Sequence, residues 1–180
     1  MLTVVFCADP LRPARVDPHF ARQAAAVGEL GGTVALIDHD ALVSGDTPAA
    51  VRRVPRDAGP VWYRGWMVTA DDYAELDTAL AARGTHLVTG ADRYRAAHEL
   101  PGWYDVFAEV TPESTWLPRP PGHALSTAEV EKLVEPLGAG PGIVKDYVKS
   151  RKHEWAEACY LPDLADLDAV ARVIGRMVEL

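Results

Sequence analysis

The stretch Gly142–Leu161 carries the densest positive charge of a chain whose formal net charge is −8. Its basic residues are Lys145, Lys149, Arg151, Lys152 and His153. Ammonium and guanidinium groups form charge-assisted hydrogen bonds with phosphate oxygens, each worth about 1.5–3 kcal/mol where the pair is partly desolvated. The cluster therefore indicates a local anionic ligand such as a polyphosphate. From the residues alone, the alternative is a solvated strand edge on which lysines discourage aggregation.

The residues around this cluster predict the elements that position it. Ile143–Lys149 and Trp155–Leu161 are strand-like runs, and Ser150–His153 would form the turn between them. Alternate side chains of a strand share one face, so Lys145 and Lys149 would project from the same surface of the sheet. The basic turn would add further hydrogen-bond donors on a mobile connection.

Composition limits the classes of function. An acidic chain with a pI near 5.2 argues against general nucleic-acid or anionic-membrane binding, because those functions need a basic face over much of the domain. Cys7 and Cys159 lie in apolar runs and fit buried, reduced thiols. Neither a signal peptide nor a spanning apolar run is recognisable. We therefore expect a cytoplasmic protein with no nucleic-acid and no membrane partner.

The histidines, cysteines and tryptophans add little chemistry to this pattern. The six histidines and two cysteines show none of the spacings typical of zinc sites, so no metal ligand is assigned to this chain. The five tryptophans are scattered through apolar runs, and we expect them to pack in the core rather than to form a base-stacking surface.

The first half of the chain alternates strand and helix signals. Apolar runs at Leu2–Cys7 and Thr33–Ile37 flank apolar residues at helical spacing over Phe20–Leu30, which predicts parallel strands joined by a right-handed crossover. The same rhythm repeats as strand, capped helix, strand and helix at Val61–Met67, Thr69–Gly84, His86–Val88 and Ala91–Glu99. We therefore expect an α/β, Rossmann-like domain with a parallel sheet.

One arginine of this half is placed for binding. Arg64, in the motif YRGW, lies at a predicted strand end, and open α/β sheets bind ligands beyond the carboxyl ends of their strands. Its planar guanidinium would hold a carboxylate or a phosphate through two parallel hydrogen bonds.

The proline-rich segment 117–125 is the predicted boundary between two domains, residues 1–116 and residues 126–180. After it, Ser126 and Glu129 form a capping box at the start of a helix that ends at Gly138. The two strand-like runs follow, and a final helix carries aspartates near its amino end. The second domain is therefore expected to be helix, strand, strand and helix.

These residues bear a family resemblance. IVKDYVKSRKHEWAEACYLP resembles the nucleotide-binding strand, loop and return strand of a bacterial ATP-grasp family, in the clade characterised by an arginine and a pair of lysines in its nucleotide site. VWYRGWM, YRAAHELPGWY and TPESTW resemble further segments of that family in the same order. The resemblance runs from about Val61 to the carboxyl end. It implies a Rossmann-like pre-ATP-grasp domain followed by the first α/β subdomain of an ATP-grasp fold.

The resemblance also implies roles for the basic residues. Lys145 would bind ATP phosphate and the adenine edge, and the segment Lys149–His153 would cover the phosphates, with contacts expected from Lys149, Lys152 and His153. Arg64 is assigned to the nucleotide site by position only. No catalytic residue is identified.

ATP-grasp enzymes join a carboxylate to an amine through an acyl phosphate, so the resemblance implies ATP and Mg²⁺ as cofactors and a small-molecule or peptide carboxylate as substrate. The second ATP-grasp subdomain, which brings the Mg²⁺ ligands, is not recognisable before Leu180. We therefore expect the chain to be the nucleotide-binding half, inactive alone and completed by a C-terminal half or a second chain. The alternative is a non-catalytic remnant or interaction module with an incomplete nucleotide site.

Overall fold

The structure is a computed structural model that describes residues 2–120 and 122–180. It divides into two compact units, unit 1 (Met1–Arg95) and unit 2 (Ala96–Leu180). This division falls earlier in the chain than the proline-rich segment 117–125. The segment that leads up to residue 116, which the sequence assigned to the first domain, is therefore counted with unit 2.

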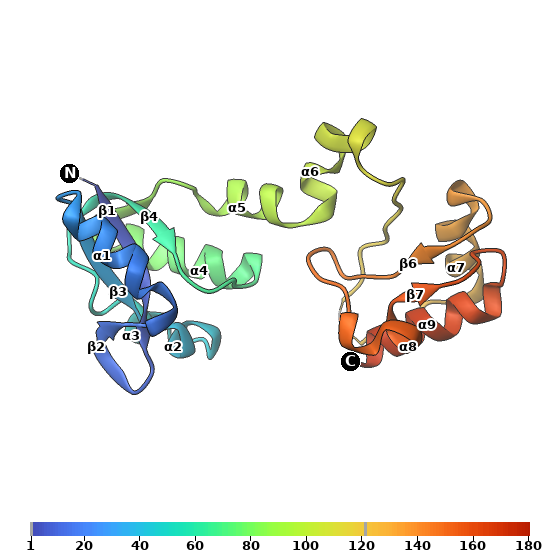
Figure 1. Cartoon of the computed structure of the whole chain (residues 1–180), viewed down its shortest axis with the longest axis horizontal. Coiled ribbons are helices and arrows are strands. Elements are labelled where there is room, and N and C mark those ends of the chain that lie inside the picture. The colour runs from blue at the N-terminus through green and yellow to red at the C-terminus, as the bar shows by residue number, and fades with distance from the viewer. Residues whose placement is uncertain (1, 121) are drawn as a thin grey trace. The chain divides into compact units, whose positions relative to one another are not determined.

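Unit 1 contains a mostly parallel sheet (Figure 1). Strand β1 (Thr3–Asp9) pairs in parallel with β3 (Thr33–Ile37) on one side and β4 (Gly59–Arg64) on the other, and β5 (Thr85–Leu87) pairs in parallel with β4. The antiparallel strand β2 (Arg12–Val16), which the sequence did not predict, folds back on the end of β1. This arrangement is that of an α/β fold, as the alternating sequence pattern predicted.

Short-range capping signals define the helices of unit 1. The longest helix, α4, begins after Thr69, whose hydroxyl accepts a hydrogen bond from the Asp72 backbone N–H at 3.1 Å. The chain leaves this helix through Gly84, whose φ of +72° suits glycine. The helices are a 3₁₀ turn η1 (Pro18–Phe20), α1 (Ala21–Glu29), α2 (His39–Val43), α3 (Thr47–Ala50), α4 (Ala70–Ala81) and α5 (Ala91–His98).

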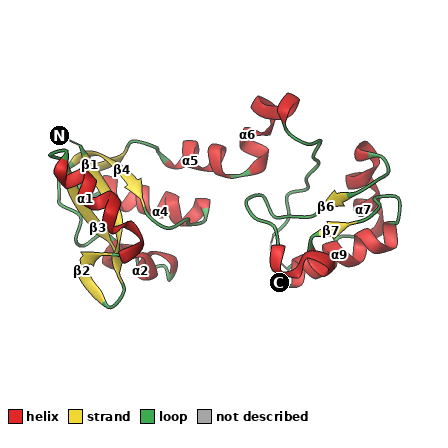
Figure 2. Cartoon of the chain, viewed as in Figure 1, coloured by secondary structure: helices red, strands yellow, loops and turns green. Residues whose placement is uncertain are grey.

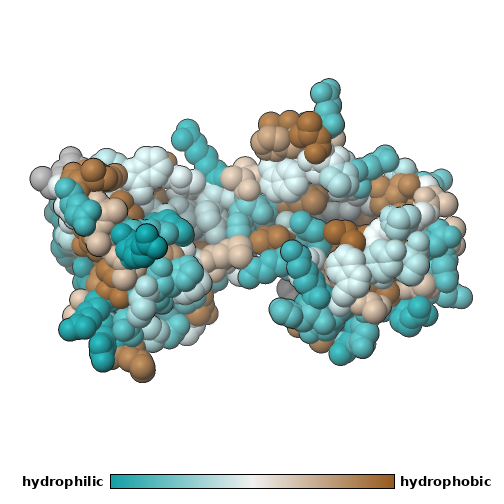
Figure 3. Space-filling model, in the orientation of Figure 1, coloured by the Kyte–Doolittle hydropathy of each residue, from teal (hydrophilic) through white to brown (hydrophobic). Residues whose placement is uncertain are grey.

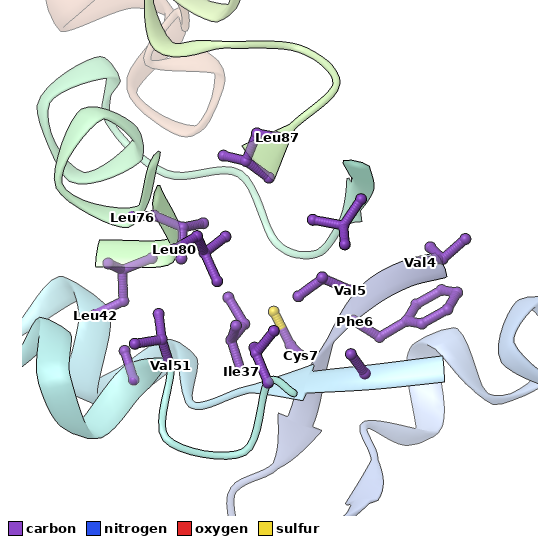
Figure 4. Close-up of a cluster of buried hydrophobic side chains, with 14 of the residues drawn as sticks. Val4, Val5, Phe6, Cys7, Ile37, Leu42, Val51, Leu76, Leu80 and Leu87 are labelled. Atoms are coloured by element: carbon purple, nitrogen blue, oxygen red, sulfur yellow. The ribbon is translucent and has the colours of Figure 1, made fainter. Parts of the chain in front are cut away.

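The core of unit 1 lies between the sheet and these helices (Figure 4). Val5, Ile37, Leu76 and Leu80 are fully buried, and the thiol of Cys7 lies among them as the sequence predicted. Complete burial of an aliphatic side chain contributes about 1.5–3 kcal/mol relative to exposure. This apolar layer therefore stabilises the parallel strands in addition to their backbone hydrogen bonds.

Unit 2 has its own smaller core. The capping box of Ser126 and Glu129 is present at the start of α7, as predicted, and the Asp166 carboxylate accepts the Ala169 N–H at 3.0 Å at the start of α9. The buried residues that pack together in this core are Val130, Val134, Leu161, Leu164, Val170 and Val173. The elements are α6 (Leu100–Phe107), η2 (Ala108–Val110), α7 (Thr127–Val134), η3 (Glu135–Leu137), β6 (Gly142–Ile143), η4 (Lys152–Glu154), α8 (Trp155–Ala158), β7 (Tyr160–Leu161) and α9 (Leu167–Glu179).

The two long strands predicted for unit 2 are wrong in extent. In this unit β6 and β7 are short, and each spans two residues (Figure 2). The run Ile143–Lys149 leaves the extended conformation because Asp146 hydrogen-bonds to the backbone that follows it. The run Trp155–Leu161 begins as the helix α8, whose Ala and Glu residues favour that conformation.

An aspartate connects the turn before β6 to the residues that follow β7. The Asp163 Oδ1 atom accepts the backbone N–H groups of Gly140 and Ala165, both at 3.0 Å, and Leu164 N–H donates to Gly140 C=O at 2.8 Å. The two N–H donors lower the pKa of Asp163, because they stabilise its ionised form. A Cβ atom at Gly142 would lie 2.9 Å from the Leu164 side chain, so the chain enters β6 in close contact with the core.

Unit 2 exposes apolar side chains along α6 and η2 (Figure 3). Val106, Phe107 and Val110 are 78%, 52% and 82% exposed. Across the residues that the structure describes, no helix has the length and apolar character that crossing a bilayer requires.

The core of unit 1 supplies the first prediction. Leu76→Ala removes a fully buried side chain and is expected to lower the free energy of unfolding of unit 1 by about 2–5 kcal/mol, because it deletes apolar contacts and leaves a cavity. Leu30→Ala, at a position 83% exposed in the same unit, is expected to change it by less than about 0.5 kcal/mol. Hydrogen exchange of the β1 amides across a urea series measures both values, and equal effects of the two substitutions would contradict this core assignment.

The Asp163 contacts predict a dependence of stability on pH. Since the pKa of Asp163 is lowered on folding, its ionised form stabilises unit 2 above the usual carboxyl pKa of about 3.8, and this contribution is lost as the pH falls through the lowered pKa. Asp163→Asn is therefore expected to lower the free energy of unfolding of unit 2 near neutral pH. The gap in this free energy between the variant and the unsubstituted protein should shrink below about pH 3.8. Urea midpoints measured from exchange of the Gly140 amide test this.

Asp168→Asn is the control, because the exposed Asp168 carboxylate accepts no backbone N–H among the described residues. If Asp163→Asn lowers the free energy of unfolding of unit 2 by the same amount from about pH 7 to about pH 2.5, the proposed ionic contribution is ruled out.

Candidate functional site

The basic segment, residues 145–153, forms most of the connection between β6 and β7. Gly142 pairs with Leu161 and Ile143 with Tyr160 in antiparallel register, and Val144 N–H donates to Cys159 C=O at 2.7 Å. This backbone pairing brings the two ends of the connection together. The basic residues therefore lie in a loop whose two ends are hydrogen-bonded to each other, and not in a long strand.

A tight turn fixes the first part of the basic segment. The Asp146 Oδ1 atom accepts the backbone N–H of Val148 at 2.6 Å and also that of Lys149, while Asp146 N–H donates to Lys149 C=O at 3.0 Å. Lys145 immediately precedes this turn and Lys149 closes it. The two lysines are therefore related by a turn, and the shared strand face that the sequence predicted for them is wrong.

Tyr147 anchors the turn to α6. Its carbonyl accepts the Leu100 N–H at 2.9 Å, and its hydroxyl is buried without a hydrogen-bond partner among residues 2–120 and 122–180. Burial, together with the nearby Glu99 carboxylate, raises the pKa of Tyr147. The phenol therefore stays neutral at physiological pH. Sequence reasoning placed Tyr147 beside the lysines and missed this anchoring role.

The basic side chains of this segment differ in exposure, but none of them forms an ion pair within the described part of the chain. Lys145 and Arg151 are half-buried, whereas Lys149, Lys152 and His153 are exposed. Within the described part of the chain, no carboxylate lies within ion-pair distance of any of the five, and the ion pairs that are present join other arginines to acids. The segment also contains the Asp146 carboxylate, but its basic side chains outnumber this acid, so it presents a net positive charge, which favours an anionic ligand.

An exposed aromatic pair adjoins the basic segment. The rings of Trp155 and Tyr160 stack with centroids 5.4 Å apart and an interplanar angle of 11°. Trp155 is 47% exposed, and Ile143, the partner of Tyr160 across the sheet, is 56% exposed. Trp155 is thus not a core residue, and neither are Trp62 and Trp66, which contradicts the expectation that the tryptophans pack in the core. The aromatic pair offers a flat apolar surface next to the cations.

Arg64 belongs to unit 1. It is the last residue of β4, is exposed, and holds its guanidinium carbon 5.3 Å from the centre of the Phe20 ring. The structure therefore brings four of the five predicted site residues, Lys145, Lys149, Lys152 and His153, into one segment of unit 2, and it places Arg64 in the other unit.

The remaining features of the chain limit what unit 2 does on its own. Among residues 2–120 and 122–180, no group of three or more His, Cys, Asp and Glu side chains is arranged to hold a metal ion. A cavity of about 400 Å³ in unit 2 is lined by residues 114–117 and by α7, so it lies away from the basic segment. Lys149 and Lys152 of the basic segment and Trp155 of the aromatic pair are exposed.

Comparison with known proteins agrees with part of this picture. No curated protein matches the chain. Residues 136–180, a quarter of the chain, match the model of an ATP-grasp domain family, the third family of the clade named for one arginine and two lysines. The match begins in η3, includes β6, the basic segment, the aromatic pair and β7, and ends with α9. It indicates that this part of unit 2 is similar to an ATP-binding, ligase-type domain.

Proposed function

We propose that residues 136–180 form the phosphate-binding half of the nucleotide site of an ATP-dependent carboxylate–amine ligase. The observation that carries the proposal is the basic segment itself. Five basic side chains without ion-pair partners in the described chain lie on a segment that matches an ATP-grasp domain. A solvated edge explains the charge but not its position on a connection fixed by Asp146 and Tyr147.

The lysines have different roles in this proposal. Lys145 is half-buried next to β6, where reduced screening by water strengthens a charge-assisted hydrogen bond, so it contributes most to phosphate binding. Lys149, Lys152 and His153 are exposed and cover the phosphates from the solvent side of the segment. The Asp146 turn keeps Lys149 close to Lys145 before the ligand arrives, which lowers the entropic cost of binding.

The aromatic pair accounts for the rest of the nucleotide. A base that stacks on an exposed aromatic ring gains about 1–3 kcal/mol. Trp155 and Tyr160 present such a ring next to the cations, so we assign the adenine to this surface.

The proposed reaction needs two transfers. A carboxylate oxygen attacks the γ-phosphorus of ATP, the bond to the bridging oxygen breaks, and ADP leaves; an amine nitrogen then attacks the acyl carbon, phosphate leaves, and the amine proton passes to solvent. Unit 2 contributes positive charge that binds the triphosphate and stabilises the charge on the transferring group. Among the described residues, no group of three or more His, Cys, Asp and Glu side chains is arranged to hold Mg²⁺.

Most of the basic side chains and Trp155 are exposed, so the proposal requires a second surface to enclose the nucleotide. We propose that it comes from outside residues 136–180, either elsewhere in the same polypeptide or on another chain.

Lysine substitutions test the nucleotide site. Lys145→Gln is expected to weaken ATP binding about tenfold or more, because loss of one charge-assisted contact of about 1.5–3 kcal/mol corresponds to that change or a larger one. Lys132→Gln removes the same charge from the exposed face of α7, outside the basic segment, and is expected to leave the affinity unchanged within about twofold. Isothermal titration calorimetry with ATP at low ionic strength measures both affinities.

Two controls separate this function from its alternatives. Saturable ATP binding that Lys145→Gln does not change would remove Lys145 from the site. Absence of any ATP binding would favour a remnant without nucleotide function. Tighter binding of a single-stranded oligonucleotide than of ATP, with a steep loss of affinity as salt rises, would instead indicate a nucleic-acid surface.

A further inference from the structure

A second cluster of aromatic and charged side chains lies in unit 1, at the carboxyl end of β1 and β4. The chain leaves β1 for its neighbour β3, and the next strand, β4, pairs with the opposite side of β1. Such a reversal of strand order opens a crevice at the carboxyl edge of an open α/β sheet, and ligands bind there. The β2 hairpin does not displace this edge, because Asp17 N–H donates to Cys7 C=O at 3.0 Å and returns the chain to the end of β1.

The buried ring of Phe20 is the centre of this cluster. The ring centroid of His19 lies 4.8 Å from it, that of Trp66 lies 5.2 Å from it, and the Arg64 guanidinium carbon lies 5.3 Å from it. The His19 ring also contacts that of Trp66, with centroids 4.5 Å apart and the ring planes tilted by 33°. Asp17, His19, Phe20, Arg64 and Trp66 are called the Phe20 cluster below. Its members come from two segments far apart in the sequence.

Hydrogen bonds fix the indole of Trp66. Its Nε1–H donates to Asp17 Oδ2 at 3.1 Å, and its backbone N–H donates to the Cys7 sulfur at 3.3 Å. The preceding Gly65 has no room for a side chain, since a Cβ atom would lie 2.7 Å from the Cys7 sulfur. Trp66 is nevertheless 39% exposed. A tryptophan held in one orientation with part of its ring open to solvent is a preformed surface for a planar group.

Arg64 provides the charge beside this surface. Its position is set by the parallel register, in which it pairs with Phe6 of β1, and by its contact with the Phe20 ring. No acidic side chain in residues 2–120 and 122–180 forms an ion pair with it. An exposed guanidinium that is held in place without a counter-ion suits a carboxylate, which matches the spacing of its N–H groups.

The neighbouring acids favour a singly charged ligand. Asp17 already accepts the Trp66 indole N–H and the His19 backbone N–H, and Asp9 accepts the Leu11 backbone N–H at 2.9 Å. Both carboxylates are thus occupied by neutral donors, and their negative charge remains at this edge of the sheet. Attraction to the single Arg64 guanidinium and repulsion from the carboxylates both double for a dianionic phosphate, so the second negative charge brings no net Coulomb gain here. The bidentate fit of a carboxylate to the guanidinium then decides between the two ligands.

We propose that the Phe20 cluster is a binding site for a small organic acid that carries a planar group. The carboxylate pairs with Arg64, and the planar group lies on the exposed part of the Trp66 indole next to His19. The site is formed by unit 1 alone, so the inference is independent of the nucleotide site proposed for unit 2. It also replaces the nucleotide-binding role that the sequence assigned to Arg64.

Benzoate is the probe for this site, and the indole N–H resonances of a ¹⁵N-labelled full chain are the readout. Trp66→Phe identifies the Trp66 resonance by its loss. Addition of benzoate is expected to shift that resonance with a saturable dependence, whereas benzyl alcohol, which lacks the charge, and sodium chloride are expected not to. ATP, in a separate titration, should shift the Trp155 resonance, so that the two proposed sites succeed or fail separately.

Arginine substitutions complete the experiment. Arg64→Gln is expected to weaken benzoate binding about tenfold or more. Arg12→Gln, which removes an exposed arginine from β2 in the same unit, is expected to have no effect. If Arg64→Gln does not fold, Arg64→Lys carries the test and should weaken binding at least about threefold, since it keeps the charge but loses the bidentate geometry.

Three results would overturn the inference. The first is the absence of a saturable shift at Trp66, and the second is equal affinity of benzoate for Arg64→Gln and the unsubstituted protein. The third is binding of inorganic phosphate or sulfate to this site at least as tight as that of benzoate, which would show a general anion site.

Discussion

The short antiparallel pairing of β6 with β7 is the constraint on which the proposed nucleotide site depends. Two residue pairs and one further backbone hydrogen bond bring the ends of the basic segment together, and the core of unit 2 supports them through Leu161 and Leu164. A pairing of this length is marginal without such packing. Asp163 adds a polar connection between the turn before β6 and the start of the last helix. The cations therefore lie on a connection whose ends are fixed and whose middle is exposed, a combination suited to a ligand that must enter and leave.

Both units carry basic side chains without ion-pair partners, and the neighbouring side chains differ between the two units. In unit 2 several cations lie together beside a stacked aromatic pair, which suits a polyanion attached to a flat base. In unit 1 a single guanidinium lies in a cluster whose indole is fixed by Asp17, which suits a singly charged planar acid. The number of cations and the presence of neighbouring acids, rather than net charge, distinguish the two proposed ligands. An acidic chain can therefore carry two anion sites, because each acts over a distance shorter than the screening length of about 8–10 Å.

The family comparison and the geometry support each other over the same residues. The matched region 136–180 contains the basic segment and the aromatic pair, and it indicates an ATP-binding, ligase-type domain. The geometry adds features that a motif does not express, such as the buried Tyr147 hydroxyl and the turn closed by Asp146. The identity of the acid and the amine that a ligase of this kind would join depends on surfaces beyond these residues.

The sequence by itself determined the elements that rest on local signals. The strands at β1 and β3, the helix capped by Thr69 and the capping box of Ser126 and Glu129 follow from apolar runs and from side chains that bond a few residues away. The sequence also located the basic residues but did not predict their conformation. The strand pattern of Ile143–Lys149 competes with the turn formed by Asp146, and the contact of Tyr147 with α6 accompanies that turn. Only the tertiary structure decided that Trp66 lies against Asp17 and that Arg64 lies over Phe20. Those contacts join β4 and the residues after it to the link after β1, far apart in the sequence, and they exist only once the parallel register of the sheet has formed.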